Sequence, residues 1–338
     1  ALFELVSERS VLDKVEKNIK ELLHVYDSNK ELEHFIKNPT RSFTDQLNII
    51  NKLSQIMNFS KIRSYAKLNL SLNVIKKIPK KNHLIESIIT FINLHDLIFI
   101  RQAQLRKHKI EFIGKFSKKI SKKNSIQKLL NLLDQKKLLQ DKKFEIKIIK
   151  NIPQKSGMGG GSINASRIMK YFLTNQIVKK NKKYIISILK SIGSDVPLGL
   201  DIQNLVLTKN GKLCKFKKKL NFHTLVVKPH FGCSTKTIYS KSRIRNKSLY
   251  TKPGTSLFSK ENIIKSKNDL EGAAFKLYPK LKEIKLFLCS LPRVIFARMT
   301  GSGSCVVAYY ATKKDAAKGL KLFKKKYKNY WCIVSKTI

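Results

Sequence analysis

The sequence predicts a fold of mixed helices and strands from about residue 62 onward, preceded by a short segment that is helical throughout. In the first sixty residues glycine is absent, and apolar side chains recur at helical spacing, namely Leu12, Val15, Ile19, Leu22 and Tyr26. Residues 66–74 instead alternate apolar and polar side chains, as a half-buried strand does. Residues 144–148 alternate in the same way and lead through a glycine cluster into a helical pattern.

The rest of the chain continues this mixed pattern. Two apolar stretches, residues 85–92 and 97–100, predict separate strands, because polar residues interrupt them at 93–96. Helices are predicted at 125–139, 184–192 and 313–326, and short strands at 225–227, 306–310 and 331–334.

The composition restricts the class of protein. Of 338 residues, 42% are apolar, and 70 basic against 22 acidic residues give a net charge of +48. Such a charge first suggests a nucleic-acid partner. The lysines are scattered from end to end with little aromatic interleaving, so we interpret them as a solvated surface that favours anionic ligands, and we expect no nucleic-acid partner.

Cysteine usage and hydropathy indicate a cytoplasmic protein. The five cysteines lie far apart without paired metal-ligand spacing, which is typical of free thiols in a reducing cytosol. Apolar runs are too short to span a membrane, and the N-terminus lacks the pattern of a signal peptide. The sequence leaves the oligomeric state open between a monomer and a weak dimer.

Residues 153–166 form the most distinctive stretch. Four of the fourteen glycines fall within five positions, at 157, 159, 160 and 161, between a predicted strand and a predicted helix. Without a Cβ, backbone N–H groups can approach a phosphate, and the helix N-terminus adds partial positive charge. The spacing fits neither the Walker motif nor Gly-x-Gly-x-x-Gly. The stretch therefore predicts a phosphate-binding loop, with an ordinary tight turn as the alternative.

Four motifs occur in a characteristic order, at 66–70 (AKLNL), 153–166, 194–197 (SDVP) and 297–305 (ARMTGSGSC). Together they resemble the small-molecule kinases named for galactose, homoserine, mevalonate and phosphomevalonate, the GHMP superfamily. Within it, the chain looks most like the 4-diphosphocytidyl-2-C-methyl-D-erythritol kinases. The resemblance covers roughly four-fifths of the chain, from about residue 64 to the C-terminus.

The resemblance implies an α+β, two-domain fold after the helical extension of residues 1–60. Residues 61–220 would form a ribosomal-protein-like, ATP-binding N-terminal domain, and residues 221–338 a ferredoxin-like C-terminal domain. The implied reaction uses ATP and Mg²⁺ to phosphorylate the 2-hydroxyl of a small-molecule substrate, the cytidine diphosphate of methylerythritol. It is a step of the non-mevalonate route to isoprenoid precursors.

The resemblance also implies roles for individual residues. Asp195 takes the position of the catalytic base and Lys67 that of its partner, while Asn69 and His83 match positions near the cytidine end of the substrate. No residue is assigned as a metal ligand. The ATP phosphates would lie against six residues of the loop, Pro153, Gly157, Gly159, Gly160, Gly161 and Ser162. Gly301 and Gly303 are expected to support this loop by close packing.

One departure from the family pattern concerns the nucleobase. Asn82 stands before His83, where family members often carry an aromatic residue that stacks on the cytosine. Phe231 or Tyr239 is the alternative source of a stacking ring.

The first sixty residues resemble part of a different family. Residues 1–5 (ALFEL) and 35–39 (FIKNP) look like the N-terminal helical domain of the ATP synthase δ subunit. Three functions therefore stay open at this point. They are the kinase above, another kinase of the superfamily acting on mevalonate, homoserine or a sugar, and an interaction protein that uses the helical segment.

Overall fold

The computed structural model describes residues 59–76, 83–118, 120–242 and 246–338. The helices predicted within residues 1–58 lie outside the described residues, as does Asn82. Nearly all described residues belong to one compact unit, made of residues 62–98 and 102–338.

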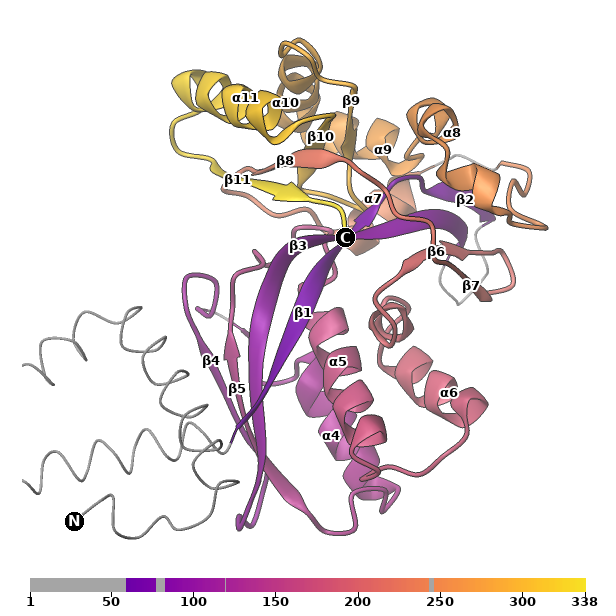
Figure 1. Cartoon of the computed structure of the whole chain (residues 1–338), viewed down its shortest axis with the longest axis vertical. Helices are drawn as coiled ribbons and strands as arrows, with labels where there is room; N and C mark the ends of the chain where they lie inside the picture. Colours follow the sequence, from indigo (N-terminus) through magenta and orange to yellow (C-terminus); the bar gives the residue numbers. More distant parts are fainter. Residues whose placement is uncertain (1–58, 77–82, 119, 243–245) are drawn as a thin grey trace, which may run out of the picture. The chain divides into compact units, whose positions relative to one another are not determined.

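The first half of this unit is built on a seven-stranded sheet (Figure 1). Its main strand order is β4-β5-β3-β6-β7, and β1 and β2 also pair with the long strand β3. The strands are β1 (Ser60–Asn69), β2 (Asn73–Lys76), β3 (Leu84–Ala103), β4 (Lys109–Ile113), β5 (Lys143–Ile149), β6 (Asn204–Leu207) and β7 (Leu213–Phe216). Three helices lie on the same side of the sheet, α4 (Ser125–Gln135), α5 (Gly160–Thr174) and α6 (Lys182–Ile192).

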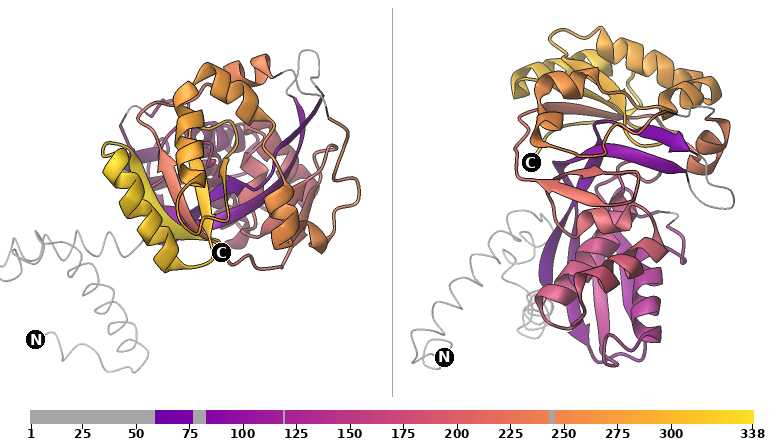
Figure 2. Two further views of the ribbon diagram at one scale, coloured as in Figure 1. Left: turned by 90° about the horizontal axis from the view of Figure 1, so that it is seen from above. Right: turned by 90° about the vertical axis from the view of Figure 1, so that its right-hand side faces the viewer.

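The second half is built on a four-stranded antiparallel sheet of order β11-β8-β10-β9. Its strands are β8 (His223–Lys228), β9 (Phe296–Met299), β10 (Val306–Tyr310) and β11 (Trp331–Lys336). Helices α10 (Pro279–Cys289) and α11 (Lys313–Lys326) pack against it. The shorter helices are η1 (Val196–Gly199), α7 (Thr235–Lys241), η2 (Thr255–Phe258), α8 (Lys260–Lys265) and α9 (Leu270–Leu277). The right-hand view of Figure 2 shows the two halves from the side, with the orange and yellow elements at one end.

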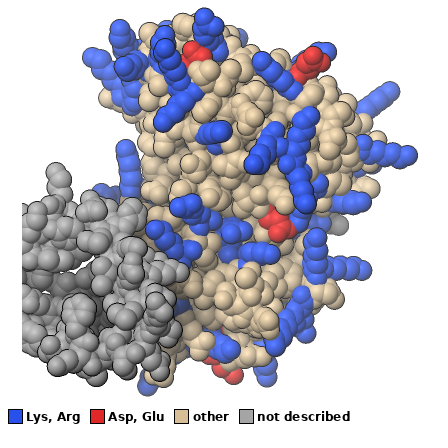
Figure 3. Space-filling model, viewed as in Figure 1, with Lys and Arg blue, Asp and Glu red and all other residues tan. Residues whose placement is uncertain are grey.

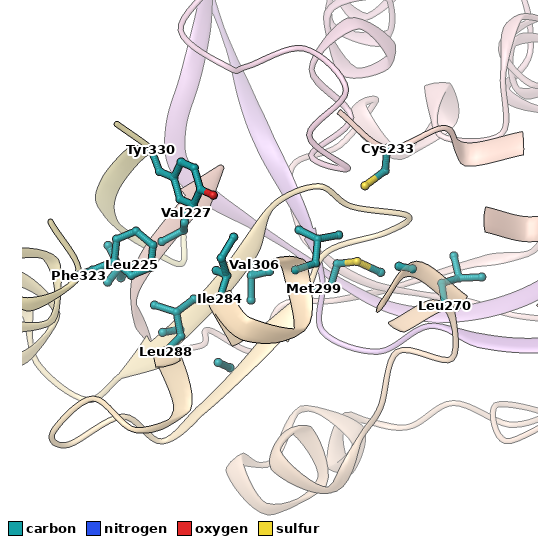
Figure 4. Close-up of a cluster of buried hydrophobic side chains, with 14 of the residues drawn as sticks. Leu225, Val227, Cys233, Leu270, Ile284, Leu288, Met299, Val306, Phe323 and Tyr330 are labelled. Carbon is teal, nitrogen blue, oxygen red and sulfur yellow. The ribbon is translucent and has the colours of Figure 1, made fainter. Parts of the chain in front are cut away.

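The four-stranded sheet is buried on both faces. On one face Leu225 and Val227 pack against Ile284, Leu288 and Phe323 of the covering helices, as Figure 4 shows. Because successive side chains of a strand point to opposite faces, Val226, which lies between Leu225 and Val227, belongs to another cluster. That cluster joins the two sheets through Leu68, Leu70, Ile92, Val226 and Val307. Apolar packing on both faces therefore fixes the two halves of the unit against each other.

The predicted α+β class is confirmed, and the helices predicted near 125–139, 184–192 and 313–326 are present. The division predicted at 93–96 is wrong, because β3 runs unbroken from Leu84 to Ala103. Leu94 is buried there, and the carboxylate of Asp96 accepts hydrogen bonds inside the protein, so these residues do not end the strand. The strand predicted at 66–74 is divided instead: β1 ends at Asn69 and β2 begins at Asn73.

Two predictions from composition can also be compared with the structure. All five cysteines are free thiols. Among the described residues, no helix has both the length and the apolar character needed to cross a membrane.

Packing between α11 and β10 gives a test of the fold. A Cβ added to Gly319 would lie 2.9 Å from Cζ of Tyr310 and closer still to its hydroxyl, and this ring is fully buried. Gly319→Ala should therefore lower the free energy of unfolding by about 1–3 kcal/mol, as overpacked cores do. Gly272→Ala in α9 is the control, because its Cβ meets nothing within 4 Å. It should be neutral or stabilising in urea unfolding, since alanine favours helices by about 1 kcal/mol. Equal midpoints for the two variants would contradict this packing.

Candidate active site

The glycine loop joins β5 to α5 and packs on a second loop, residues 300–305. Gly157 and Gly159 have φ angles of 76° and 70°, in the left-handed region that favours glycine. A Cβ on Gly157 would lie 3.1 Å from the Gly303 carbonyl oxygen and closer still to that of Thr300. Cys305 N donates to the Ser156 carbonyl at 3.2 Å. The two loops are therefore in contact through their backbones. This close packing was predicted from Gly301 and Gly303.

A pocket of about 390 Å³ opens over the glycine loop and the start of α5. α5 begins at Gly160, so unpaired N–H groups of its first turn belong to the same region. All six residues predicted to bind ATP line this pocket: Pro153, Gly157, Gly159, Gly160, Gly161 and Ser162. The arrangement suits a polyphosphate, and the assignment of ATP to it stays a prediction.

Lys67 and Asp195 form an ion pair beside the glycine loop, with 3.2 Å between Lys67 Nζ and Asp195 Oδ2. The lysine side chain is 4% exposed and the aspartate side chain 39%. Lys67 N donates to the Met158 carbonyl at 3.1 Å. A Cβ on Gly159 would lie 3.0 Å from Lys67 Cγ, so the lysine stem lies flat against the loop. The structure thus holds one buried ammonium between the loop and an accessible carboxylate.

Asn69 lies next to Lys67 and holds it in place. Lys67 Nζ donates to Asn69 Oδ1 at 2.6 Å, and Asn69 Nδ2 donates to Ser87 Oγ at 2.8 Å. The backbone N of Asn69 donates to Thr300 Oγ1 at 3.0 Å, across to the second loop. Asn69 therefore links the ion pair to both β3 and the second glycine loop.

His83 lies against Tyr239 of α7. The two rings have centroids 4.9 Å apart and are tilted by 38°. Burial raises the pKa of the Tyr239 hydroxyl, and the negative charge of Asp195 raises it further. Tyr239 is thus close enough to both residues to belong to the site. Sequence reasoning named it only as an alternative, because α7 carries no local motif and lies more than 150 positions after His83.

Comparisons with known proteins identify the family of this chain. The family model "GHMP kinases N terminal domain" matches residues 124–201, and "GHMP kinases C terminal" matches residues 257–329. The 4-diphosphocytidyl-2-C-methyl-D-erythritol kinase of Pelagibacter ubique is 51% identical over 282 residues, covering 83% of this chain and 100% of that protein. This chain belongs to the 4-diphosphocytidyl-2-C-methyl-D-erythritol kinase family.

Solved structures support the fold of this kinase family. A crystal structure of 4-(cytidine 5'-diphospho)-2C-methyl-D-erythritol kinase aligns with a TM-score of 0.67 at 20% identity, over 82% of this chain and 99% of that chain. The mevalonate kinase of Methanococcus jannaschii aligns with a TM-score of 0.57 at 17% identity, over 83% and 98%. At these identities the likeness shows the GHMP fold alone.

The N-terminal resemblance also has a match. The family model "ATP synthase delta (OSCP) subunit" matches residues 1–70, slightly beyond the predicted segment of residues 1–60. The last ten of these matched residues, from Lys61, include Lys67 and Asn69 of strand β1 in the kinase sheet. The limits predicted for the three domains stay predictions.

Contact between the two glycine loops predicts the effect of a minimal change. Gly157→Ala should displace one loop from the other, because its Cβ would overlap the Thr300 carbonyl and its φ is positive. We expect the free energy of unfolding, measured in urea, to fall by about 1–3 kcal/mol. Binding of a non-hydrolysable ATP analogue should also weaken. Gly161→Ala, whose Cβ has nothing within 4 Å, should retain the wild-type midpoint. A wild-type midpoint in both variants would argue against this loop packing.

Proposed function

We propose that this chain transfers the γ-phosphoryl group of ATP to the 2-hydroxyl of 4-diphosphocytidyl-2-C-methyl-D-erythritol, with Mg²⁺ accompanying the nucleotide. The observation that carries the proposal is the Lys67–Asp195 pair beside the glycine loop. It occurs in a chain half identical to a kinase named for this substrate. The five free thiols fit a reaction in the reducing cytosol.

The chemistry requires positioning more than covalent help. In the transfer, the substrate oxygen forms a bond to the γ-phosphorus while the bond from that phosphorus to the bridging oxygen of ADP breaks. Asp195 accepts the hydroxyl proton and later releases it to solvent. The Lys67 ammonium stays within 3.2 Å of that carboxylate and orients it toward the hydroxyl. Its positive charge also stabilises negative charge that develops near the transferred group.

Mg²⁺ fits this site as a partner of the phosphates rather than as a resident ion. Among the described residues, no group of three His, Cys, Asp or Glu side chains could hold a metal by itself. Mg²⁺ in kinases commonly keeps several waters and binds substrate phosphates with one or two protein oxygens. Here the Ser162 hydroxyl in the pocket lining is an oxygen that would contact the ion beside the phosphates. When bound, the ion neutralises charge on the triphosphate.

The cytosine of the substrate binds at His83 and Tyr239. Phe231 and Tyr239 are the two predicted sources of a ring that stacks on the cytosine in place of residue 82. Phe231 stacks on Tyr278, with ring centroids 5.7 Å apart, and packs against the core of the second half. Tyr239 instead contacts His83, and the charge of Asp195 raises its pKa. A base against these rings leaves the methylerythritol end of the substrate near Asp195.

Positive charge favours this anionic substrate over nucleic acid. Lysine and arginine side chains are spread over the face drawn in Figure 3, with few acidic side chains between them. Such a surface attracts phosphorylated small molecules in general, and on the face shown the basic side chains form no single stripe of the kind that follows a nucleic-acid backbone.

A comparison of acceptors tests the proposal directly. ADP release should depend on ATP, Mg²⁺ and 4-diphosphocytidyl-2-C-methyl-D-erythritol, and should be far slower with mevalonate, homoserine or galactose. Asp195→Ala and Lys67→Ala should each lower kcat/KM by about 10²–10⁴-fold, the usual contribution of a positioned acid–base group. Urea unfolding verifies that both variants fold. Full activity in both variants would overturn the site assignment, and preference for another acceptor would overturn the substrate.

Substitutions of Tyr239 test the nucleobase site. Tyr239→Ala should raise KM for the cytidine substrate by about tenfold, because base–aromatic stacking contributes about 1–3 kcal/mol. KM for ATP should stay unchanged. Tyr239→Phe is the matched control and should behave as wild type between pH 6 and 9, because the raised pKa keeps the native hydroxyl protonated throughout that range. A higher KM for ATP in Tyr239→Ala would place this ring in the nucleotide site instead.

The δ-subunit match motivates a second, independent test. A chain that starts at Lys61 should retain kinase activity if residues 1–60 serve another purpose. Binding of the full chain, but not of this shorter chain, to ATP synthase subunits would support an interaction role for the segment. Absence of binding by both would remove that role.

A further inference from the structure

A buried ionic cluster lies beneath the glycine loop, centred on Asp96 in the middle of β3. The Asp96 side chain is fully buried, and that of Lys150 is 5% exposed. Lys150 Nζ donates to Asp96 Oδ2 and forms an ion pair with it. None of the roles derived above uses either residue. A charged pair at this depth is costly unless its remaining hydrogen-bonding capacity is filled.

The other hydrogen bonds of Asp96 reach both ends of the glycine loop. On the entry side, the backbone N–H groups of Asn151 and Ile152 each donate to Asp96 Oδ1 at 2.8 Å. On the exit side, Asn164 Nδ2 donates to Asp96 Oδ2 at 2.9 Å from within α5. One carboxylate therefore ties together the segment before residue 153 and the helix that follows the loop.

Lys150 lies directly against the loop. A Cβ placed on Gly160 would be 3.3 Å from Lys150 Nζ, and both residues line the pocket described above. Asn164 lines the same pocket, and within the part of the chain that the structure describes its buried Oδ1 has no hydrogen-bond partner. The cluster is thus in contact with the place where the phosphates are proposed to bind.

The charges of the pair have opposite consequences for a bound triphosphate. Asp96 alone would place a buried negative charge beneath the phosphates and repel them. The Lys150 ammonium cancels that charge and leaves the hydrogen bonds of the carboxylate to hold the loop. Asp96 can therefore hold the loop in a form that accepts phosphates only when Lys150 neutralises its charge.

We infer that Asp96 is a positioning residue of the nucleotide site, which holds both ends of the glycine loop, and that Lys150 neutralises it so that the loop accepts a triphosphate. This inference rests on the proposed function, since it assigns the pocket over the loop to ATP. It concerns the nucleotide only, and the acceptor site at His83 and Tyr239 is not affected.

The experiment compares Asp96→Asn, Lys150→Met and the double variant. Both single variants should raise KM for ATP, and Kd for a non-hydrolysable ATP analogue, by about 10- to 100-fold, the loss of affinity that corresponds to one hydrogen bond to a charged phosphate. KM for the cytidine substrate should stay within about twofold. The double variant has no uncompensated buried charge, so it should bind the analogue more tightly than Lys150→Met does.

Two controls separate positioning from mere stability. Lys147→Met removes a lysine of β5, three positions before Lys150, that is partly exposed and paired with Glu145, and it should leave both constants unchanged. Urea midpoints report how far each variant is destabilised. Equal shifts in the constants for both substrates, or wild-type affinity for the analogue in the single variants, would overturn the inference. If neither single variant folds, wild-type affinity in the double variant would overturn it.

The analogue also separates this inference from the proposed function. If the wild-type chain binds the analogue but phosphorylates a different acceptor, the proposed substrate fails while the role of Asp96 is still measured by Kd. If the chain phosphorylates the cytidine substrate and the single variants bind ATP normally, the role of Asp96 fails and the proposed function stands.

Discussion

Contact between the backbones of two glycine loops is the constraint on which the rest of the site depends. Gly157 leaves no room for a side chain against Thr300, so the two loops pack backbone to backbone. The second loop connects β9 and β10 of the four-stranded sheet, whereas the first follows β5 of the seven-stranded sheet. The glycine loop that lines the proposed nucleotide pocket is therefore attached to the seven-stranded sheet and packed against a loop of the four-stranded sheet.

The scarcity of acidic residues gives each buried carboxylate a large structural role. Glu86 is fully buried and accepts hydrogen bonds from Ser248 and from the backbone of Leu249 and Tyr250, which holds that segment against β3. Asp96 fixes the glycine loop in the same manner from the same strand. In a chain with a net charge of +48 such carboxylates are not surface counterions. Asp195 differs from both because its side chain is 39% exposed, which suits the proton-accepting role proposed for it.

Much of the site could be predicted from the sequence because it lies in local motifs. The glycines of 157–161 constrain the backbone by their own chemistry, and the predicted strand around Lys67 and the turn at Asp195 are short local patterns. Their pairing could not be derived from pattern alone, because 128 positions separate Lys67 from Asp195, and the family resemblance supplied it. The break predicted at residues 93–96 was wrong for a related reason. Periodicity treats Asp96 as a strand-ending polar residue, whereas its partners at 151, 152 and 164 are remote in sequence.

Recognition of the proposed substrate then follows from the same joining of halves. Tyr239, the proposed contact of the nucleobase, comes from α7 in the second half, and His83 precedes β3 in the first. Asp195 pairs with Lys67, and its charge raises the pKa of Tyr239, while Lys67 lies against the glycine loop. Under the proposed function, a substrate whose cytosine contacts Tyr239 therefore presents its other end to Asp195, which pairs with Lys67 beside the glycine loop.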